Sequence, residues 1–292
     1  MSRAGNWFSE HVVDWSGSTR GLALMRIGVV LVAWARLSEQ LRPFDDLAPE
    51  RLVLGGSFFA ASSLLLIGRW TPIAAVWHAI NMVVIYQVFG LGWFGVDRVE
   101  PWSHHHVYTQ VATAVLLALT PCGRSLSLDR WLQVRRAERA ETPLPPETGA
   151  LWAVRLIQLQ VVAMYLWTTW DKLFWAFING ERHQQYAAWL YFGGDLPEGI
   201  WFTAMTATMG SVTVVVEGAL PILLLIPRTR SIAIVSGIVL HGLIFLLLPV
   251  STFSMSMWVL YIAFVDPSYL HQLIDRLLGH GRASAVQGPG HG

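Results

Sequence analysis

The sequence has little charge, one cysteine and one lysine. Asp, Glu, Lys and Arg make up 13% of its 292 residues, whereas soluble domains carry about 25%. The lone cysteine, Cys122, excludes an internal disulfide and argues against a cysteine-based metal site, so we expect no metal. The formal net charge is +1, so the composition shows no sign of a basic surface that would bind nucleic acid. The N-terminal residues include Glu10 and Asp14 and do not resemble a secretory signal peptide.

The sequence is rich in long apolar stretches. A helix needs about 20 mostly apolar residues to span a bilayer. We therefore expect an all-α integral membrane protein with about eight transmembrane helices in contact with the lipid bilayer. The candidate spans are residues 21–38, 52–68, 72–94, 106–121, 151–176, 203–226, 231–249 and 250–266.

Arginine placement predicts how these spans are oriented. With the N-terminus inside, the inner segments hold twelve arginines and the outer segments four, which is the bias typical of cytoplasmic loops. We predict a multi-pass protein of the cell membrane (inner or plasma membrane) with both termini cytoplasmic. The predicted parts are an interfacial segment at 1–20, a transmembrane domain at 21–268 with a cytoplasmic loop at 122–150 and an outer cap at 177–202, and a cytoplasmic tail at 269–292. The cap is rich in aromatic residues, so we expect a short amphipathic or re-entrant segment on the outer surface.

The span at 151–176 carries a polar face. Steps of three and four residues place six positions on one side of a helix, and these are Arg155, Gln158, Val162, Tyr165, Thr169 and Lys172. Lipid cannot satisfy polar groups, so this face is expected to point into the helix bundle or a water-containing cavity. Ionisable residues inside a bilayer are functional hypotheses by default. The other such residues are Arg26, Arg36, His78, Glu217 and His241.

Lys172 stands out because the other nineteen basic residues are arginines. Arginine cannot be deprotonated in proteins, whereas lysine can, and burial favours the neutral amine. A neutral amine in a dry pocket is a competent general base. A structural interpretation stands beside this one, in which Lys172 reaches the lipid headgroups or pairs with Asp171 or Glu217.

A run of histidines begins the span at 106–121. By the predicted topology this end and Lys172 lie at the same depth, so we expect His106 and Lys172 to meet and name both as candidate catalytic residues. The histidine would orient a substrate or stabilise an anion. Candidate substrate-binding residues around the two are His105, Tyr108, Gln110, Tyr165, Thr169, Trp170 and Trp175, and their aromatic rings suit a flat quinone. Structural or secondary roles are assigned to Arg26, Arg155, Glu217 and His241, with a Glu217–His241 pair linking the sixth and seventh spans.

Several of these segments carry a family resemblance. In chain order they read RGLALMRIGV, HVYTQVATAVLLALTPCGRSLSLDRW, RLIQLQVVAMYLWTTWDKLFWAFING, VVEGALPILLLIPRTR and HGLIFLLLPVSTFSMSMWVLYIAF. Together, over residues 18–268, they resemble the HTTM (horizontally transferred transmembrane) family, which is related to the membrane domain of vitamin K-dependent gamma-carboxylase. The resemblance implies a lyase-like membrane protein of the kind found in bacteria.

The resemblance also implies roles for single residues. Lys172 matches the base that deprotonates vitamin K hydroquinone, His106 matches a histidine that assists, and His241 matches a histidine of the penultimate span. A reduced quinone is therefore the implied cofactor, and carboxylase- or epoxidase-like chemistry is the implied activity. The carboxylases carry a large extracytoplasmic domain after the spans, whereas this chain ends at Gly292. We therefore expect a quinol or another membrane-associated substrate at the outer face.

Two classes of function stay open at this point. In the first, the protein is an enzyme with a buried lysine as base. In the second, it is a non-catalytic membrane scaffold, or a partner of another membrane or secreted protein in the maturation or export of a secreted peptide, and Lys172 pairs structurally. Replacing Lys172 by arginine separates the two because arginine keeps the charge and removes the base.

Overall fold

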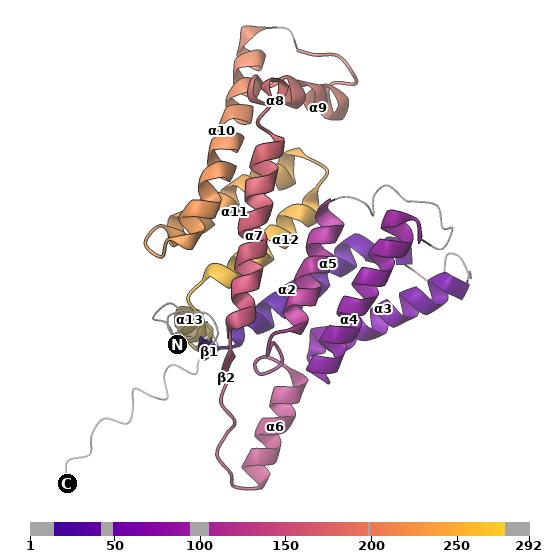
Figure 1. Cartoon of the computed structure of the whole chain (residues 1–292), viewed down its shortest axis with the longest axis vertical. Coiled ribbons are helices and arrows are strands. Elements are labelled where there is room, and N and C mark those ends of the chain that lie inside the picture. The colour runs from indigo at the N-terminus through magenta and orange to yellow at the C-terminus, as the bar shows by residue number, and fades with distance from the viewer. Residues whose placement is uncertain (1–14, 42–48, 94–104, 198, 278–292) are drawn as a thin grey trace, which may run out of the picture. The chain divides into compact units, whose positions relative to one another are not determined.

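The computed structural model describes residues 15–41, 49–93, 105–197 and 199–277 (Figure 1). Residues 1–14 of the predicted interfacial segment and residues 278–292 of the predicted cytoplasmic tail lie outside these described residues. The chain divides into two units, the first formed by Met1–Ile157 with Pro249–Gly292 and the second by Gln158–Leu248. The division falls inside one helix, so the two units are described separately.

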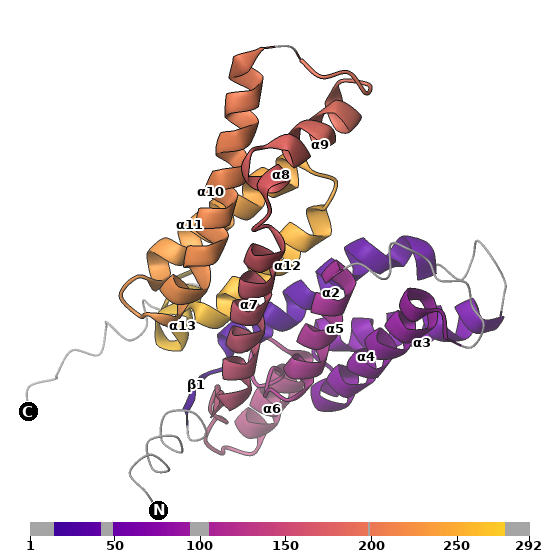
Figure 2. The ribbon, with the colours of Figure 1, turned by 45° about the horizontal axis from the view of Figure 1, so that its top comes forward.

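The first unit is helical apart from one short strand pair. Its helices are α2 (Arg20–Leu41), α3 (Pro49–Ile67), α4 (Thr71–Ile85) with the π-helix η2 (Tyr86–Gly90), α5 (His105–Ala118), α6 (Leu128–Arg139), the start of α7 (Trp152–Asp171), α12 (Ser251–Tyr261) with the 3₁₀-helix η5 (Ile262–Phe264), and α13 (Pro267–Leu277). Helices α2 to α5 pack side by side in Figures 1 and 2. The strands β1 (Ser16–Ser18) and β2 (Thr148–Ala150) pair antiparallel, which departs from the all-α prediction.

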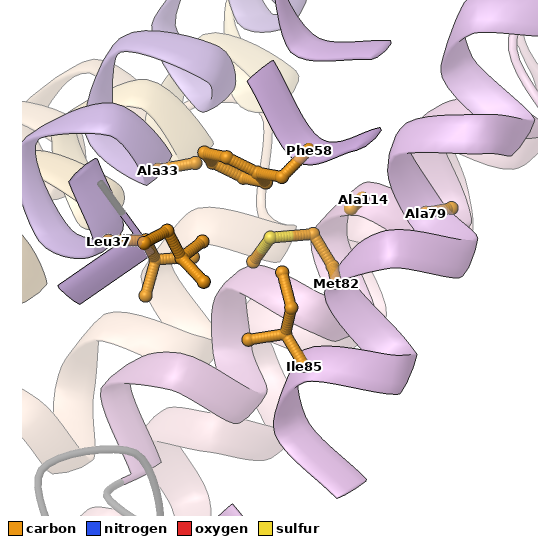
Figure 3. Close-up of a cluster of buried hydrophobic side chains, with 8 residues drawn as sticks. Ala33, Leu37, Phe58, Ala79, Met82, Ile85 and Ala114 are labelled. Carbon is orange, nitrogen blue, oxygen red and sulfur yellow. The ribbon is translucent and has the colours of Figure 1, made fainter. Parts of the chain in front are cut away.

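A buried apolar cluster holds α2 to α5 together (Figure 3). Its members are Ala33, Leu37 and Leu41 of α2, Phe58 of α3, Ala79, Met82 and Ile85 of α4, and Ala114 of α5. In a bilayer, helices associate mainly through close packing, because lipid tails are as apolar as leucine. The three alanines fit this requirement because small side chains let helix backbones approach.

Buried polar contacts fix the loops at one end of these helices. The guanidinium of Arg26 is fully buried and donates to the carbonyl oxygens of Cys122 at 2.8 Å and Leu126 at 2.6 Å. Asp129 accepts hydrogen bonds from the backbone N–H groups of Trp70 at 3.0 Å and Thr71 at 2.8 Å. The loop after α5 is therefore tied to α2, and the start of α6 is tied to the turn between α3 and α4.

A second polar cluster, the Arg20 corner, joins three distant segments. Arg20 donates to the carboxylates of Glu147 at 2.7 Å and Asp275 at 2.5 Å, and Ser18 is hydrogen bonded to His271 at 2.8 Å. The beginning of α2, the segment before β2 and α13 thus meet in one place. The sequence assigns all three to the same side of the membrane.

The second unit contains the rest of α7 and four further helices. These are α8 (Trp175–Ile178), α9 (Glu181–Tyr191), α10 (Ile200–Leu225) and α11 (Arg230–Leu247). Helices α8 and α9 lie against α10 in both views (Figures 1 and 2). The predicted span at 151–176 was too long, since α7 ends at Asp171. The N–H of Lys172 bonds the carbonyl of Thr169 at 3.1 Å, a three-residue step that tightens the last turn of a helix.

Two glycines let the segment after α7 pack directly on α10. Gly180 has φ +86°, and a Cβ added there would lie 2.3 Å from the backbone nitrogen of Ala207. A Cβ at Gly210 would lie 2.2 Å from the carbonyl oxygen of Phe177. Any side chain at either position must push the two backbones apart.

We expect Gly210→Ala to destabilise the protein by about 1–3 kcal/mol, because its methyl group would overpack a backbone contact. The matched control is Gly242→Ala on α11, where an added Cβ meets nothing within 4 Å and alanine stabilises a helix by roughly 0.5–1 kcal/mol. Thermal unfolding of the two variants in detergent measures the difference. Equal shifts in the two midpoints would contradict the close contact at Gly210.

Four helices of the described ranges are long and apolar enough to cross a membrane: Arg20–Ser38, Thr71–Gly90, Ile200–Leu225 and Arg230–Leu247. Leu52–Ile67, His106–Ala118 and Ser251–Phe264 are shorter apolar helices. Helix α7 falls outside both groups because its polar face lowers its apolarity. The apolar helices are those of a membrane protein, and the count of about eight spans stays a prediction.

Candidate functional site

Lys172 and Glu217 form an ion pair in the second unit. The Nζ of Lys172, one residue beyond α7, lies 2.5 Å from Oε2 of Glu217 on α10. The Glu217 side chain is 4% exposed and the Lys172 side chain 25% exposed. Such a pair is stable only with good geometry, because two charges leave water. The structure thus contains the Lys172–Glu217 pair that the structural interpretation of the sequence had named as one possibility.

A second buried polar contact joins α7 to α11. The hydroxyl of Tyr165 is hydrogen bonded to Nε2 of His241 at 2.7 Å, and both residues are buried. The sequence placed Tyr165 against a substrate and paired His241 with Glu217. In the structure Tyr165 meets His241, and Glu217 meets Lys172. The two contacts link α7 and the turn after it to α10 and α11.

His183 is a residue of this site that the sequence did not single out. It lies on α9, and its ring contacts the edge of the Phe177 ring with 4.8 Å between centroids. The ring of Phe177 lies in turn 5.9 Å from Nζ of Lys172. Within the described part of the chain, Nδ1 of His183 is buried and has no hydrogen-bond partner. Burial and the nearby charge of Lys172 hold the pKa of His183 below its ordinary value of 6.5, so its ring is neutral at neutral pH.

An apolar groove adjoins His183. It has a volume of about 240 Å³ and is lined by side chains of α10 and α11, among them Met209, Val212, Leu243 and Leu247. Thr208 and Thr213 are polar exceptions in the lining. Sites for whole small molecules are usually about 300–1,000 Å³. The groove is therefore suited to an apolar chain or to part of a ligand.

Three other predicted residues of this unit lie around the ion pair with different exposures. Thr169 is half-buried, and its Oγ1 has no hydrogen-bond partner in the described structure. Its methyl group faces Gly218 of α10. Trp170 and Trp175 are 72% and 75% exposed. These two rings lie on the surface of the unit.

The remaining predicted residues belong to the first unit. His106 is buried and stacks on Phe253 with 4.9 Å between ring centroids. Gln110 is buried and donates to Ser256 at 3.4 Å. Tyr108 is exposed. Helix α5 begins at His105. Since His106 and Lys172 are in different units, their meeting stays a prediction.

Arg155 contacts an aromatic ring of the first unit. The guanidinium of Arg155 lies over the ring of Trp15, with 4.2 Å from Cζ to the centroid. Among the residues that the structure describes, no three His, Cys, Asp or Glu side chains gather in a way that could hold a metal ion. Among the residues that the structure describes, the second unit brings together the Lys172–Glu217 ion pair, the imidazole of His183 and an apolar groove.

Comparison with known proteins identifies the family. The HTTM domain model matches residues 94–269, which is more than half of the chain. The match includes His106, Lys172, Glu217 and His241, and it confirms the resemblance seen in the sequence. No curated protein and no solved structure matches the chain. The chain therefore belongs to the HTTM domain family, a family of membrane proteins related to gamma-carboxylase.

Proposed function

We propose that the protein is a membrane enzyme that uses Lys172 as a base on a reduced quinone or another membrane-associated substrate at the outer face. The proposal includes about eight spans and an outer cap at 177–202 that lies in or on the membrane surface. The observation that carries it is the contact of Lys172 with Glu217, together with His183, which lines the apolar groove and whose Nδ1 has no hydrogen-bond partner in the described structure. Membership of a gamma-carboxylase-related family supports it.

The ion pair supplies a way to make a neutral amine. If the ammonium of Lys172 passes a proton to the carboxylate of Glu217 across 2.5 Å, both groups become neutral. The amine can then take the proton of a substrate hydroxyl group, so that the substrate O–H bond breaks and an N–H bond forms on Lys172. General base catalysis of this kind contributes typically about 10²- to 10⁴-fold to a rate.

The residues present fit a quinol. When bound, a quinol supplies a hydroxyl group that can lose its proton. The groove offers an apolar surface for its chain, and the free Nδ1 of His183 offers one hydrogen bond to a ring oxygen. A neutral imidazole can donate or accept this bond. His183 would thus orient the ring while Lys172 acts as the base.

The ion pair also favours a second candidate function. A complete Lys172–Glu217 pair joins the end of α7 to α10, which is sufficient for a structural role. In that case the protein is a scaffold, or a partner of another membrane or secreted protein in maturation or export, and the exposed rings of Trp170 and Trp175 contact lipid or that partner.

Mass spectrometry of copurifying lipids tests the enzyme proposal. We expect a quinone to copurify with the wild-type protein and to fall by about tenfold, equivalent to 1.4 kcal/mol, in Lys172→Ala and in Val212→Phe, which fills the groove. Ile222→Phe is the matched control, because Ile222 is an exposed residue of the same helix α10 outside the groove. The absence of any quinone, or equal quinone in all four proteins, would count against the proposal.

A further inference from the structure

Helix α13 carries an exposed apolar stripe. Tyr269, Leu273 and Leu277 are spaced four residues apart, so they lie along one side of the helix. Their exposed fractions are 60%, 37% and 77%. Three large apolar side chains in a row need a covering, because such a stripe in water is unfavourable.

The neighbouring side of the same helix is already held against the first unit. Ile274 is buried, and the side chain of Leu270 faces Gly21, where an added Cβ would lie 3.1 Å from a methyl group of Leu270. Asp275 accepts a hydrogen bond from Arg20 at 2.5 Å. The helix is therefore fixed in its place and presents its stripe in a defined direction.

The contacts of α13 also place it at the end of a membrane span. Arg20 and Gly21 are the first residues of Arg20–Ser38, one of the helices that is long and apolar enough to cross the bilayer. A helix attached to the end of a span lies at the depth of the lipid headgroups. The last apolar helix, α12 with η5, leads into α13 through Val265 and Asp266 alone.

A cation borders the stripe. Arg276 is exposed and lies seven residues after Tyr269, on the same side of the helix. Basic residues beside an apolar helix face are typical of helices that lie in a membrane interface, where the cation binds anionic headgroups. The long side chain of arginine can reach the headgroups while its neighbours remain among acyl chains.

We propose that α13 is an interfacial helix whose Tyr269, Leu273 and Leu277 insert into the bilayer beside the beginning of α2, with Arg276 on anionic headgroups. Two properties favour lipid over a protein partner: the small area of the stripe and the attachment of α13 to the end of a span. Stable protein interfaces bury about 1,200–2,000 Å² in total, far more than three side chains supply. A helix fixed at a span end needs only to meet the bilayer already beside it. This inference does not depend on the proposed catalytic role of Lys172.

Site-directed fluorescence on the full-length protein in lipid nanodiscs tests the proposal. The native thiol, Cys122, is buried, and burial raises its pKa, so it reacts slowly with labels. Leu277→Cys and Gln272→Cys are each labelled with NBD, and Gln272 is the control because it is exposed and lies one turn before Arg276, at the polar edge of the stripe. We expect brominated lipid to quench the label at 277 severalfold more than the label at 272. Equal quenching at the two positions would overturn the inserted stripe.

Two further comparisons distinguish insertion of the stripe into lipid from its contact with a second copy of the protein. Raising the fraction of phosphatidylglycerol should increase quenching at 277, and Arg276→Glu should abolish that increase. Quenching that ignores lipid charge in both proteins would refute the headgroup contact of Arg276. If unlabelled Leu277→Cys forms a disulfide between two copies, and the label at 277 in a separate sample stays unquenched in brominated nanodiscs, a second copy is the occupant and the proposal is overturned.

Discussion

Replacing Lys172 by arginine is expected to lower quinol turnover by about 10²- to 10⁴-fold, the range of general base catalysis, in a protein that remains folded. Arginine can keep a charge-assisted contact with Glu217 and cannot be deprotonated at accessible pH. The structural role of the pair is thus retained and its chemical role removed. Turnover is measured by mass spectrometry of the oxidised product in aerated proteoliposomes supplied with vitamin K hydroquinone, in which dissolved dioxygen is the oxidant of the deprotonated quinol.

The matched control for this result is Arg182→Lys. Arg182 is an exposed cation of α9 in the same unit, so this exchange alters a basic residue without touching the ion pair, and turnover should stay at the wild-type level. Lys172→Met should be as inactive as Lys172→Arg. Turnover close to wild type in Lys172→Arg would refute the base and leave the scaffold as the better hypothesis.

Removing one partner of the Lys172–Glu217 pair is expected to destabilise the protein by about 3 kcal/mol, the lower end of the range for buried pairs, since Lys172 is partly exposed. Glu217→Leu leaves a cation and Lys172→Met leaves a buried carboxylate. The double variant removes both charges and should recover most of the loss. Unfolding of the four proteins in detergent gives the coupling energy as a double-mutant cycle.

The exposed pair Arg135–Glu138 on α6 provides the comparison. Its charged atoms are 3.8 Å apart, and its side chains are 59% and 53% exposed, so its coupling should stay below about 1 kcal/mol. A Lys172–Glu217 coupling no larger than this value would show that the pair is not effectively buried. A double variant as unstable as either single variant would contradict the idea that an unpaired charge causes the loss.

The sequence revealed the ionisable members of the site because they interrupt apolar stretches. Lys172, Glu217 and His241 each stand among residues that suit lipid, and position on a helix face follows from spacing alone. Their partners were harder to predict. A single sequence does not give the relative height of two packed helices, and for that reason His241 was paired with Glu217 and not with Tyr165.

The end of α7 and the role of His183 depend on tertiary packing. Leu173 and Phe174 continue the apolar pattern past Asp171, so nothing local ends the helix there. The break allows residues 177–180 to pack against Gly210, a contact between distant positions. The chain reverses direction at Gly180, and this reversal brings His183 near Lys172. A histidine in a short polar helix carries no periodic pattern that would predict this approach.

The short strands were missed for a simpler reason. β1 reads SGS and β2 reads TGA, and glycine and alanine are depleted in strands. Their pairing accompanies the contacts of the Arg20 corner, which link positions more than 120 residues apart. Long-range contacts of this kind decide such elements, and local propensity does not.

The Arg20 corner has a consequence for the order of assembly during synthesis. Asp275 follows Arg20 by 255 positions, so at 5–20 residues per second the ribosome needs roughly 13 to 50 s to supply it. During that interval the first helix is already made while its carboxylate partner on α13 does not yet exist. The N-terminal end of α2 can therefore reach its final set of contacts only after Asp275 has been synthesised.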